Sequence, residues 1–291
     1  MKIACIDIGG TSIKRLCATA EKGMKLADYR VEGFDSAPTR AAEGFEAIRS
    51  AVFDSISALI DTYGCEAIAI STAGTVDWDR GVVTFATAAL PGFTGYDIVS
   101  DVKAKFGLPV RAINDATAAA VAEHYIDKFS RQSEVVLTIG TGLGSALIRP
   151  GKLCAESVTD LHIGHVCFDE EGVPCKCGKR GCIEQYASAS ALRRMSGEDD
   201  LDKVFNDYCS YPTAIETFIK ALVKAVKLAF ETGVKRVVVG GGVAEIKGWW
   251  GGFLGKFPYE MSSRIGRAQL GNRAGALGAA YAALNGQFKN Q

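Results

Sequence analysis

The chain has 291 residues, a length that favours about two domains, and 48% of them are hydrophobic, enough for a large core. Lysine plus arginine and aspartate plus glutamate each number 33, so the net charge is zero, which argues against a nucleic-acid or anionic membrane surface. No apolar run reaches about 18 residues, and Met1 leads into a strand pattern without a signal segment. The nine cysteines then predict reduced thiols or a metal site, and we expect a soluble cytoplasmic protein without a membrane or nucleic-acid partner.

The first candidate site is D-I-G-G-T-S-I-K, residues 7–14. An apolar run, a glycine turn and a second apolar run predict a strand, a turn and a strand. Glycines let backbone N–H groups approach a phosphate, and a carboxylate at the strand end is suited to the Mg²⁺ that accompanies a nucleotide. An ordinary hairpin without a ligand is the alternative. The nucleotide-binding candidates are Asp7, Gly9, Gly10, Thr11 and Lys14.

The next segment alternates between helix and strand patterns. Apolar spacing over 43–62 predicts a helix, and the apolar run 65–70 predicts a buried strand. A loop over 71–77 follows, then a hairpin over 78–86 and a helix over 97–106.

Asn114-Asp115 lies where an apolar run gives way to an alanine-rich segment. Asx residues at such a point predict a strand end followed by a helix N-cap. For Asp115, capping is the simpler interpretation. Its place between two glycine-rich loops favours another one, in which it is the general base of a reaction between two bound substrates.

V-V-L-T-I-G-T-G-L-G-S-A-L-I, residues 135–148, repeats the design of the opening strand, turn and strand. Aligning Thr138-Ile139-Gly140 with Asp7-Ile8-Gly9 superposes the two glycine turns, so the sequence suggests a duplicated domain with a phosphate loop in each copy. A Rossmann or Walker loop fits poorly, since no G-K-[ST] appears and a strand follows the glycines. The candidates here are Gly140, Thr141, Gly142 and Gly144.

The sharpest chemical signal lies in residues 161–185, where three cysteines in C-x-C-x₄-C spacing follow a histidine. Three thiols and one imidazole suit tetrahedral Zn²⁺, with His165, Cys175, Cys177 and Cys182 as ligands. Unliganded reduced cysteines are the alternative, and the balanced charge speaks against a nucleic-acid zinc finger. The other six cysteines lie in apolar runs and are predicted to be core residues: Cys5, Cys17, Cys65, Cys154, Cys167 and Cys209.

The remaining sequence predicts a charged loop and helix start over 193–202 and a helix over 213–232. V-V-V-G-G-G-V at 237–243 predicts a strand and a glycine turn. Gly241 and Gly242 are therefore candidates for an adenosine platform, although a helix entry without a ligand fits equally well. A helix of small residues follows over 275–284.

Taken together, these motifs resemble the ROK family across nearly the whole chain. That family comprises sugar kinases, sugar-responsive repressors and uncharacterised open reading frames. The resemblance rests on D-I-G-G-T-S-I-K, I-N-D-A at 113–116, I-G-T-G-L-G at 139–144, G-H at 164–165, C-K-C-G-K-R-G-C-I-E at 175–184 and G-G-G-V at 240–243. It implies an actin-like, hexokinase-like α/β fold of two duplicated domains around a cleft. We expect these to cover residues 1–114 and 115–291, with a helix over 274–286 returning to the first.

The resemblance also implies a function, which is transfer of the γ-phosphate of ATP to a hexose hydroxyl with Mg²⁺ as cofactor. Asp115 is then the general base, and the zinc is structural. The sugar-binding residues implied are Gly74, Asn114, His162, His165 and Glu184. Family members are often dimers, so a homodimer is expected.

Several positions depart from the family pattern. His162 stands where the family usually has a sugar-binding glutamate, which predicts poor use of glucose or preference for a sugar that presents an acceptor there. Milder departures are Ala73, Thr117 and Ala146. A glucokinase-like enzyme is the first hypothesis, and a kinase of N-acetylmannosamine, N-acetylglucosamine or fructose stays open. A catalytically weak sugar sensor is the alternative from another class, while a repressor fits poorly because no helix-turn-helix precedes the first glycine turn.

Overall fold

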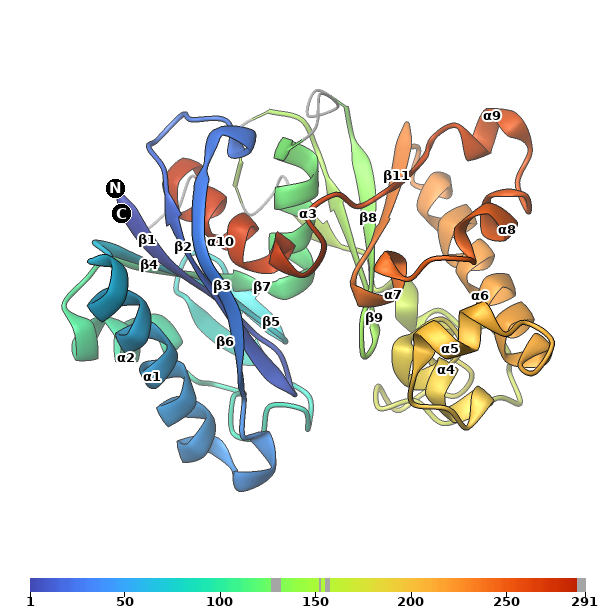
Figure 1. Ribbon diagram of the computed structural model, residues 1–291, viewed down its shortest axis with the longest axis horizontal. Helices are drawn as coiled ribbons and strands as arrows, with labels where there is room; N and C mark the ends of the chain where they lie inside the picture. Colours follow the sequence, from blue (N-terminus) through green and yellow to red (C-terminus); the bar gives the residue numbers. More distant parts are fainter. Residues whose placement is uncertain (127–131, 152, 155–157, 287–291) are drawn as a thin grey trace. The chain divides into compact units, whose positions relative to one another are not determined.

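The computed structural model describes residues 1–126, 132–151, 153–154 and 158–286 (Figure 1). The chain forms two compact units. The first comprises Met1–Arg131, Pro150–Thr159 and Asn272–Gln291, and the second comprises Gln132–Arg149 and Asp160–Gly271. Each unit contains one five-stranded sheet with its own helices.

The sheet of the first unit has the strand order β3-β2-β1-β4-β7. Its strands are β1 (Lys2–Ile8), β2 (Ser12–Thr19), β3 (Arg30–Pro38), β4 (Ala67–Thr72) and β7 (Val110–Asn114). β1 pairs antiparallel with β2 and parallel with β4, and β4 pairs parallel with β7. The carboxyl ends of β1, β4 and β7 therefore lie at one edge of the sheet, and the first glycine turn follows β1 there.

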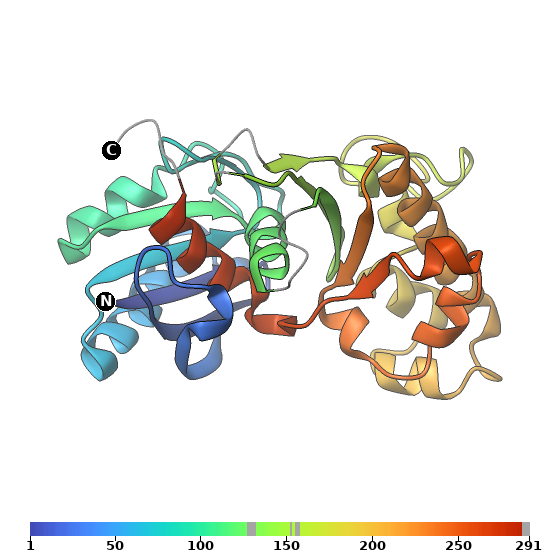
Figure 2. The ribbon, with the colours of Figure 1, turned by 90° about the horizontal axis from the view of Figure 1, so that it is seen from above.

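Helices cover both faces of this sheet (Figures 1 and 2). They are α1 (Phe45–Tyr63), α2 (Ile98–Phe106), α3 (Asp115–Ile126) and α10 (Ala274–Asn285), and a small hairpin of β5 (Thr75–Asp77) and β6 (Val82–Phe85) follows β4. Side chains alternate along a strand, so Ala4, Ile6 and Ile8 of β1 pack in one core with α1 and α2. Asp7 points to the opposite face, where α10 begins.

A second five-stranded sheet, which belongs to the second unit except for Val158 and Thr159 of its edge strand β10, repeats this order as β10-β9-β8-β11-β12. The strands are β8 (Glu134–Ile139), β9 (Leu143–Ile148), β10 (Val158–Asp160), β11 (Arg236–Gly240) and β12 (Ile265–Arg267). β8 pairs antiparallel with β9 and parallel with β11, as β1 does with β2 and β4. The two glycine turns therefore occupy equivalent places, as the sequence repeat suggests.

The helices of the second unit include the long amphipathic α6, whose apolar side packs into the core with β8 and β11. The helices are α4 (Ala189–Ser196), α5 (Leu201–Asn206), α6 (Pro212–Glu231), α7 (Gly242–Glu245), α8 (Trp250–Leu254) and α9 (Tyr259–Ser262). The charged run 193–202, expected to be a loop and a helix start, contains the last turn of α4 and the start of α5.

The first unit does not end at residue 114. α3 packs against α10 so closely that a Cβ on Gly278 would lie 1.7 Å from the carbonyl oxygen of Ala118. Both helices belong to the first unit, so the boundary expected between residues 114 and 115 falls inside it. Small residues on both helices allow this approach.

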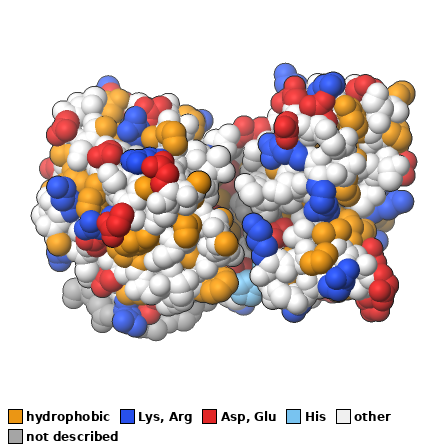
Figure 3. Space-filling view, turned by 90° about the horizontal axis from the view of Figure 1, so that it is seen from below, with side chains coloured by type: hydrophobic (Ala, Val, Ile, Leu, Met, Phe, Trp, Pro, Cys, Tyr) orange, Lys and Arg blue, Asp and Glu red, His pale blue; other side chains and the backbone are white. Residues whose placement is uncertain are grey.

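The remaining cysteines divide into two groups. Cys5, Cys17 and Cys65 are buried in the first unit, as expected, whereas Cys167 and Cys209 are exposed and Cys154 is half-buried. The prediction that all six are core residues is therefore wrong for Cys154, Cys167 and Cys209, which lie in loops beside short apolar runs. Among the described residues, no helix is both long and apolar enough to cross a membrane. Acidic and basic side chains are interspersed over the face in Figure 3.

Candidate active site

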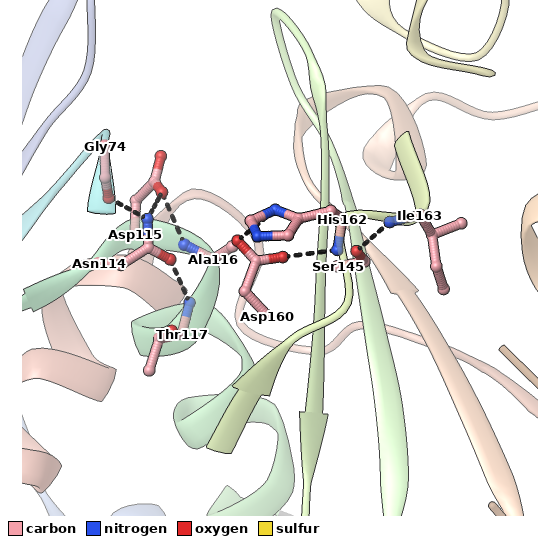
Figure 4. A network of polar contacts seen from close by, with 9 residues as sticks. All are labelled: Gly74, Asn114, Asp115, Ala116, Thr117, Ser145, Asp160, His162 and Ile163. Carbon is pink, nitrogen blue, oxygen red and sulfur yellow. Dashed lines mark hydrogen bonds and ion pairs between the residues drawn. The ribbon is translucent and has the colours of Figure 1, made fainter. Parts of the chain in front are cut away.

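The junction of β7 and α3 places Asn114 and Asp115 side by side (Figure 4). The side-chain oxygen of Asn114 accepts a hydrogen bond of 2.9 Å from the N–H of Thr117, so Asn114 caps α3. Its amide nitrogen donates to Gly74 O at 2.6 Å and to Asp115 Oδ1 at 2.9 Å. Asp115 Oδ1 also accepts from the N–H of Ala116 at 2.8 Å. Because Asn114 caps the helix, capping does not account for Asp115.

The environment of Asp115 makes its carboxyl a weaker acid than an ordinary aspartate. Burial, and next the negative charge of Asp7, raise its pKa to about 7, against the opposing hydrogen bonds from Ala116 and Asn114 and the charge of Lys14. Both hydrogen bonds fall on Oδ1. A carboxyl with a pKa near neutrality is well matched to accept a proton from a substrate hydroxyl.

Asp7 lies at the carboxyl end of β1, with only 9% of its surface exposed. Ser71 Oγ of β4 donates to Asp7 Oδ1 at 2.7 Å, and Lys14 Nζ of β2 lies 3.4 Å from Oδ2. A Cβ on Gly275, in the first turn of α10, would lie 2.7 Å from the carboxyl carbon of Asp7, so the positive end of that helix meets the carboxylate. A buried, oriented carboxylate of this kind fits Mg²⁺, which usually takes one or two carboxylates together with waters and phosphate oxygens.

The first glycine turn is closed by a hydrogen bond of 3.0 Å from Gly9 N to Ser12 O. The buried hydroxyl of Thr39 supports it from outside by donating to Gly9 O at 2.6 Å. Among the described residues, neither Gly10 nor Thr11 donates its backbone N–H to another group of the chain. The turn therefore presents two N–H groups that suit a phosphate.

Gly74 lies just after β4, at a position where the backbone requires a glycine. Its φ is +102°, and a Cβ there would lie 2.5 Å from the carbonyl oxygen of Phe85. Since its own carbonyl accepts the hydrogen bond from Asn114, Gly74 fixes the orientation of the Asn114 amide.

The second glycine turn, in the second unit, is closed by a backbone hydrogen bond that spans fewer residues, which Gly140 N donates to Gly142 O at 3.0 Å. The carboxylate of Glu184 lies against it: Oε2 accepts from Leu143 N at 3.0 Å, and a Cβ on Gly142 would lie 2.2 Å from that oxygen. Thr141 is exposed at the tip of the turn, whereas Gly144 lies within β9 and pairs with Thr138. Gly144 is thus a strand residue beside the turn.

The turn between β11 and α7 lies next to the same loop. Gly241 has a φ of +85°, and a Cβ there would lie within 2.7 Å of backbone atoms of Ile139, the last residue of β8. Gly242 begins α7 and is exposed. The structure thus brings together the nucleotide-binding candidates of the second unit.

The predicted zinc ligands converge. One ligand atom from each of His165, Cys175, Cys177 and Cys182 lies within 4.8 Å of the others. Cys177 Sγ is 3.5 Å from Cys182 Sγ, and Cys175 Sγ is 3.7 Å from His165 Nδ1. A tetrahedral zinc with bonds of about 2.3 Å to sulfur has S–S edges of about 3.8 Å, so the set fits the ion.

His162 lies directly before η4 (Ile163–His165), a 3₁₀ turn, with φ 49° and ψ 30°. Its backbone N–H donates to Asp160 Oδ1 at 2.9 Å, and its Nδ1 lies 3.2 Å from Asp160 Oδ2 (Figure 4). The imidazole is largely exposed. Of the sugar-binding candidates, Gly74 and Asn114 lie in the first unit, and His162, His165 and Glu184 lie in the second.

Sequence reasoning missed three residues that organise these sites: Ser71, Thr39 and Asp160. Ser71 lies at the end of β4, so the rule that carboxyl ends of parallel strands meet at one edge could have placed it beside Asp7. Thr39 and Asp160 carry no local signal, because they reach Gly9 and His162 only through the fold.

The raised pKa of Asp115 predicts an effect on stability. Between about pH 4 and pH 7 the folded protein keeps a proton that the unfolded chain has lost, so the stability linked to this proton is lost as the pH rises through 7. Asp115→Asn removes this dependence. The melting temperature of the variant, minus that of the wild type, is expected to increase from pH 5 to pH 8 in thermal unfolding scans.

Asp101→Asn is the matched control. The guanidinium of Arg49 holds the pKa of Asp101 below its ordinary value, through hydrogen bonds of 2.6 and 2.7 Å. That replacement should lower the melting temperature at both pH values without the increase. An Asp115→Asn difference that stays constant from pH 5 to pH 8 would contradict the proposed environment of Asp115.

Comparison with known proteins gives consistent results. The model of the ROK family matches residues 3–285. An N-acetylmannosamine kinase from Pasteurella multocida is 28% identical over 97% of this chain and 96% of its own. The crystal structure of a ROK hexokinase from Thermus thermophilus is 28% identical, covers 97% of each chain and has a TM-score of 0.74. That of a ROK family glucokinase from Streptomyces griseus, in complex with glucose and AMPPNP, is 26% identical over 96% of this chain and 98% of its own, with a TM-score of 0.76. The expected actin-like α/β fold is confirmed.

Proposed function

Because this chain belongs to the ROK family, we propose that it is an ATP-dependent sugar kinase that transfers the γ-phosphate of ATP to a hydroxyl of a hexose. The observation that carries the proposal is the carboxyl of Asp115, whose pKa is raised to about 7 and which lies at the same sheet edge as the Asp7 glycine turn. A phosphate turn and a base tuned to neutrality are the two parts that this transfer requires.

In the proposed reaction, Asp115 accepts the proton of a sugar hydroxyl while the oxygen of that hydroxyl forms a bond to the γ-phosphorus of ATP. The bond between that phosphorus and the β–γ bridging oxygen breaks, ADP leaves, and Asp115 later returns its proton to water. General-base catalysis of this kind contributes roughly 10²–10⁴ in rate. The hydrogen bonds from Asn114 and Ala116 to Oδ1 orient the carboxylate for this step.

The phosphates would be held by backbone N–H groups of the two glycine turns, at Gly9–Thr11 and Gly140–Gly142, with the adenosine at Gly241 and Gly242. Asp7 would hold the Mg²⁺ that neutralises phosphate charge when ATP is bound. Ser71 and the start of α10 keep the Asp7 carboxylate oriented for this role, and Lys14 offers its ammonium group beside it.

The sugar would be held by Gly74, Asn114, His162, His165 and Glu184. His165 has two roles in this proposal: Nδ1 faces the cysteines, and Nε2 remains for the sugar. The zinc would be structural, since three thiolates and an imidazole complete its tetrahedron without water.

Glucose is the first candidate substrate, and N-acetylmannosamine is the second because the relative from Pasteurella multocida is named for that sugar. An assay of sugar-dependent ADP formation over glucose, mannose, fructose, N-acetylglucosamine and N-acetylmannosamine tests the proposal. We expect at least one sugar to stimulate ADP formation strongly, with Asp115→Asn as the inactive control. Tight sugar binding without ADP formation would instead identify a sugar sensor.

The pH dependence of kcat/KM is expected to follow the deprotonation of the Asp115 carboxyl. Since the base must be deprotonated, kcat/KM for MgATP should fall about tenfold for each pH unit below 7 and level off above it. This parameter reports the enzyme without bound MgATP, in which the charge of Asp7 still raises the pKa of Asp115. A profile that is flat down to pH 5 would exclude Asp115 as the base.

A further inference from the structure

Thr39 is a buried residue that contacts the first glycine turn from a neighbouring strand. It directly follows Pro38, the last residue of β3, and is 0% exposed. Its backbone N–H donates to Thr11 O at 3.1 Å, which continues the pairing of β3 with β2. Its hydroxyl donates to Gly9 O at 2.6 Å. Thr39 therefore holds two carbonyl groups of the turn, although it belongs to neither glycine motif.

The hydroxyl of Thr39 takes the place of a hydrogen bond that an ordinary hairpin makes. In a hydrogen-bonded antiparallel pair, the two opposing residues exchange both N–H···O bonds. Gly9 N donates to Ser12 O at 3.0 Å, but among the described residues Ser12 N does not donate to Gly9 O in return. Because Gly9 O is bonded to Thr39 instead, the turn stays open on the side of the Ser12 N–H.

The same contact sets the direction of the Gly10 N–H. The peptide bond between Gly9 and Gly10 is trans and planar, so the C=O of Gly9 and the N–H of Gly10 point in opposite directions. Since Gly9 O points to Thr39, the N–H of Gly10 points away from it. Ala89 confines the turn further, because a Cβ on Gly10 would lie 3.0 Å from the Ala89 Cβ. Rotation of this peptide therefore requires the bond to Thr39 to break.

The chain leaves β3 by a fixed turn immediately after Thr39. The next residue, Arg40, has a φ of +61° and is one of two non-glycine residues with a positive φ in the described part of the chain. A residue with a Cβ adopts this conformation only where its surroundings impose it. Arg40 is bonded to the Glu43 carboxylate at 3.0 and 2.7 Å. The position of Thr39 is thus fixed from both sides along the chain.

We propose that Thr39 is the positioning residue of the first phosphate turn, and that its hydroxyl keeps the N–H groups of residues 10–12 open to a phosphate before the nucleotide binds. The inference rests on the proposed sugar kinase function. Without the hydroxyl, Gly9 O accepts from Ser12 N, which closes the turn and withdraws one donor. A phosphate then has to break that bond and leave Gly9 O without a partner, so the affinity for the nucleotide falls.

Amide hydrogen exchange tests the open turn without any ligand. A hydrogen-bonded N–H exchanges more slowly with solvent than one that is accessible and unbonded. Thr39→Val nearly keeps the shape of the side chain and lacks the hydroxyl. Measured by NMR, the Ser12 N–H should exchange rapidly in the wild type and roughly two- to tenfold more slowly in Thr39→Val, the effect of one hydrogen bond. A protected Ser12 N–H in the wild type, or equal rates in the two proteins, overturns the proposal.

Nucleotide affinity tests the consequence of the open turn. Calorimetry with MgATP and with adenosine, which has no phosphate, separates the phosphate turn from the rest of the site. In Thr39→Val the dissociation constant for MgATP should rise roughly five- to hundred-fold, the effect of an unpaired carbonyl, while that for adenosine stays unchanged. Thr39→Ser keeps the hydroxyl and should bind MgATP nearly as the wild type does. Equal MgATP affinity in the wild type and Thr39→Val, or no recovery in Thr39→Ser, overturns the proposal.

Ser55→Ala is the matched control. Ser55 lies in α1, is 1% exposed and also has a hydroxyl that donates to a backbone carbonyl, that of Ala51, at 2.7 Å. Its replacement should lower the melting temperature but leave both dissociation constants and the exchange of Ser12 unchanged. If Ser55→Ala weakens MgATP binding as much as Thr39→Val does, the effect is a general loss of stability and the proposal fails.

Failure of the proposed function gives a different result. If the wild type does not bind MgATP, the kinase assignment fails, whereas the exchange rate of Ser12 still reports whether Thr39 holds the turn open. Should Thr39→Val not fold, Thr39→Ala removes the same hydroxyl in a smaller side chain, and the exchange of Ser12 in the wild type alone can still overturn the proposal.

Discussion

Asp115→Asn is expected to lower kcat by roughly 10²–10⁴-fold, the range for loss of a general base, while the protein stays folded and binds ATP. Asparagine keeps an oxygen that accepts the hydrogen bonds of Asn114 and Ala116, so the junction of β7 and α3 should survive. What the amide lacks is the capacity to take a proton from a hydroxyl. The measurement is steady-state turnover with the preferred sugar, together with nucleotide binding by calorimetry.

Asp101→Asn again serves as the control, because its carboxylate pairs with Arg49 and Tyr96 in the first unit. It should reduce stability by removing this ion pair but leave the kcat of the folded protein unchanged, because neither Arg49 nor Tyr96 is among the proposed site residues. A purified Asp115→Asn protein that keeps more than about a tenth of wild-type turnover would falsify the role of general base.

One tightly bound zinc per chain is expected at His165, Cys175, Cys177 and Cys182. Binding of structural zinc contributes roughly 10–16 kcal/mol in small peptides, so its removal should unfold the loop between residues 165 and 185 locally. Elemental analysis of protein purified without chelator measures the content. Hydrogen exchange before and after chelation measures the loosening, which should be concentrated in that loop.

Cys177→Ser and Cys209→Ser form a matched pair, since both replace an exposed thiol and only the first removes a proposed ligand. Zinc affinity should fall strongly in Cys177→Ser and stay unchanged in Cys209→Ser. Protein that contains no zinc without exposure to chelator, or equal zinc content and affinity in both variants, would show that the four residues are not a zinc site.

The sequence by itself determined the features that are local or periodic. Helical spacing predicted 43–62 and 213–232, which agree with α1 and α6 to within two residues. The strand–turn–strand pattern predicted both glycine turns, because glycine and alternating apolar residues act over a few positions. The ROK motifs then predicted the actin-like fold, and the spacing of the three cysteines predicted a cluster that the structure brings together.

The family resemblance already assigned the helix over 274–286 to the first domain, but only the tertiary structure decided that α3 joins that unit as well. Both are helices of small apolar residues, and such a helix packs equally well on many surfaces. Their close contact at Gly278 and Ala118 places the end of the first unit beyond residue 114. The fold likewise decided that Cys167 and Cys209 are exposed, since a short apolar run does not show which side of a loop faces solvent.

The chemistry of the candidate sites depends most on the fold. From the sequence, capping was the simpler interpretation of Asp115, but the hydrogen bond from the N–H of Thr117 identifies Asn114 as the cap. The pKa of Asp115 depends first on burial and next on Asp7, which is more than 100 positions away in the chain but at the same edge of the sheet. The direction of His162 follows from a left-handed backbone and a carboxylate that no motif marks. Local patterns name residues, but electrostatic fields and ring orientations depend on neighbours that only the folded chain assembles.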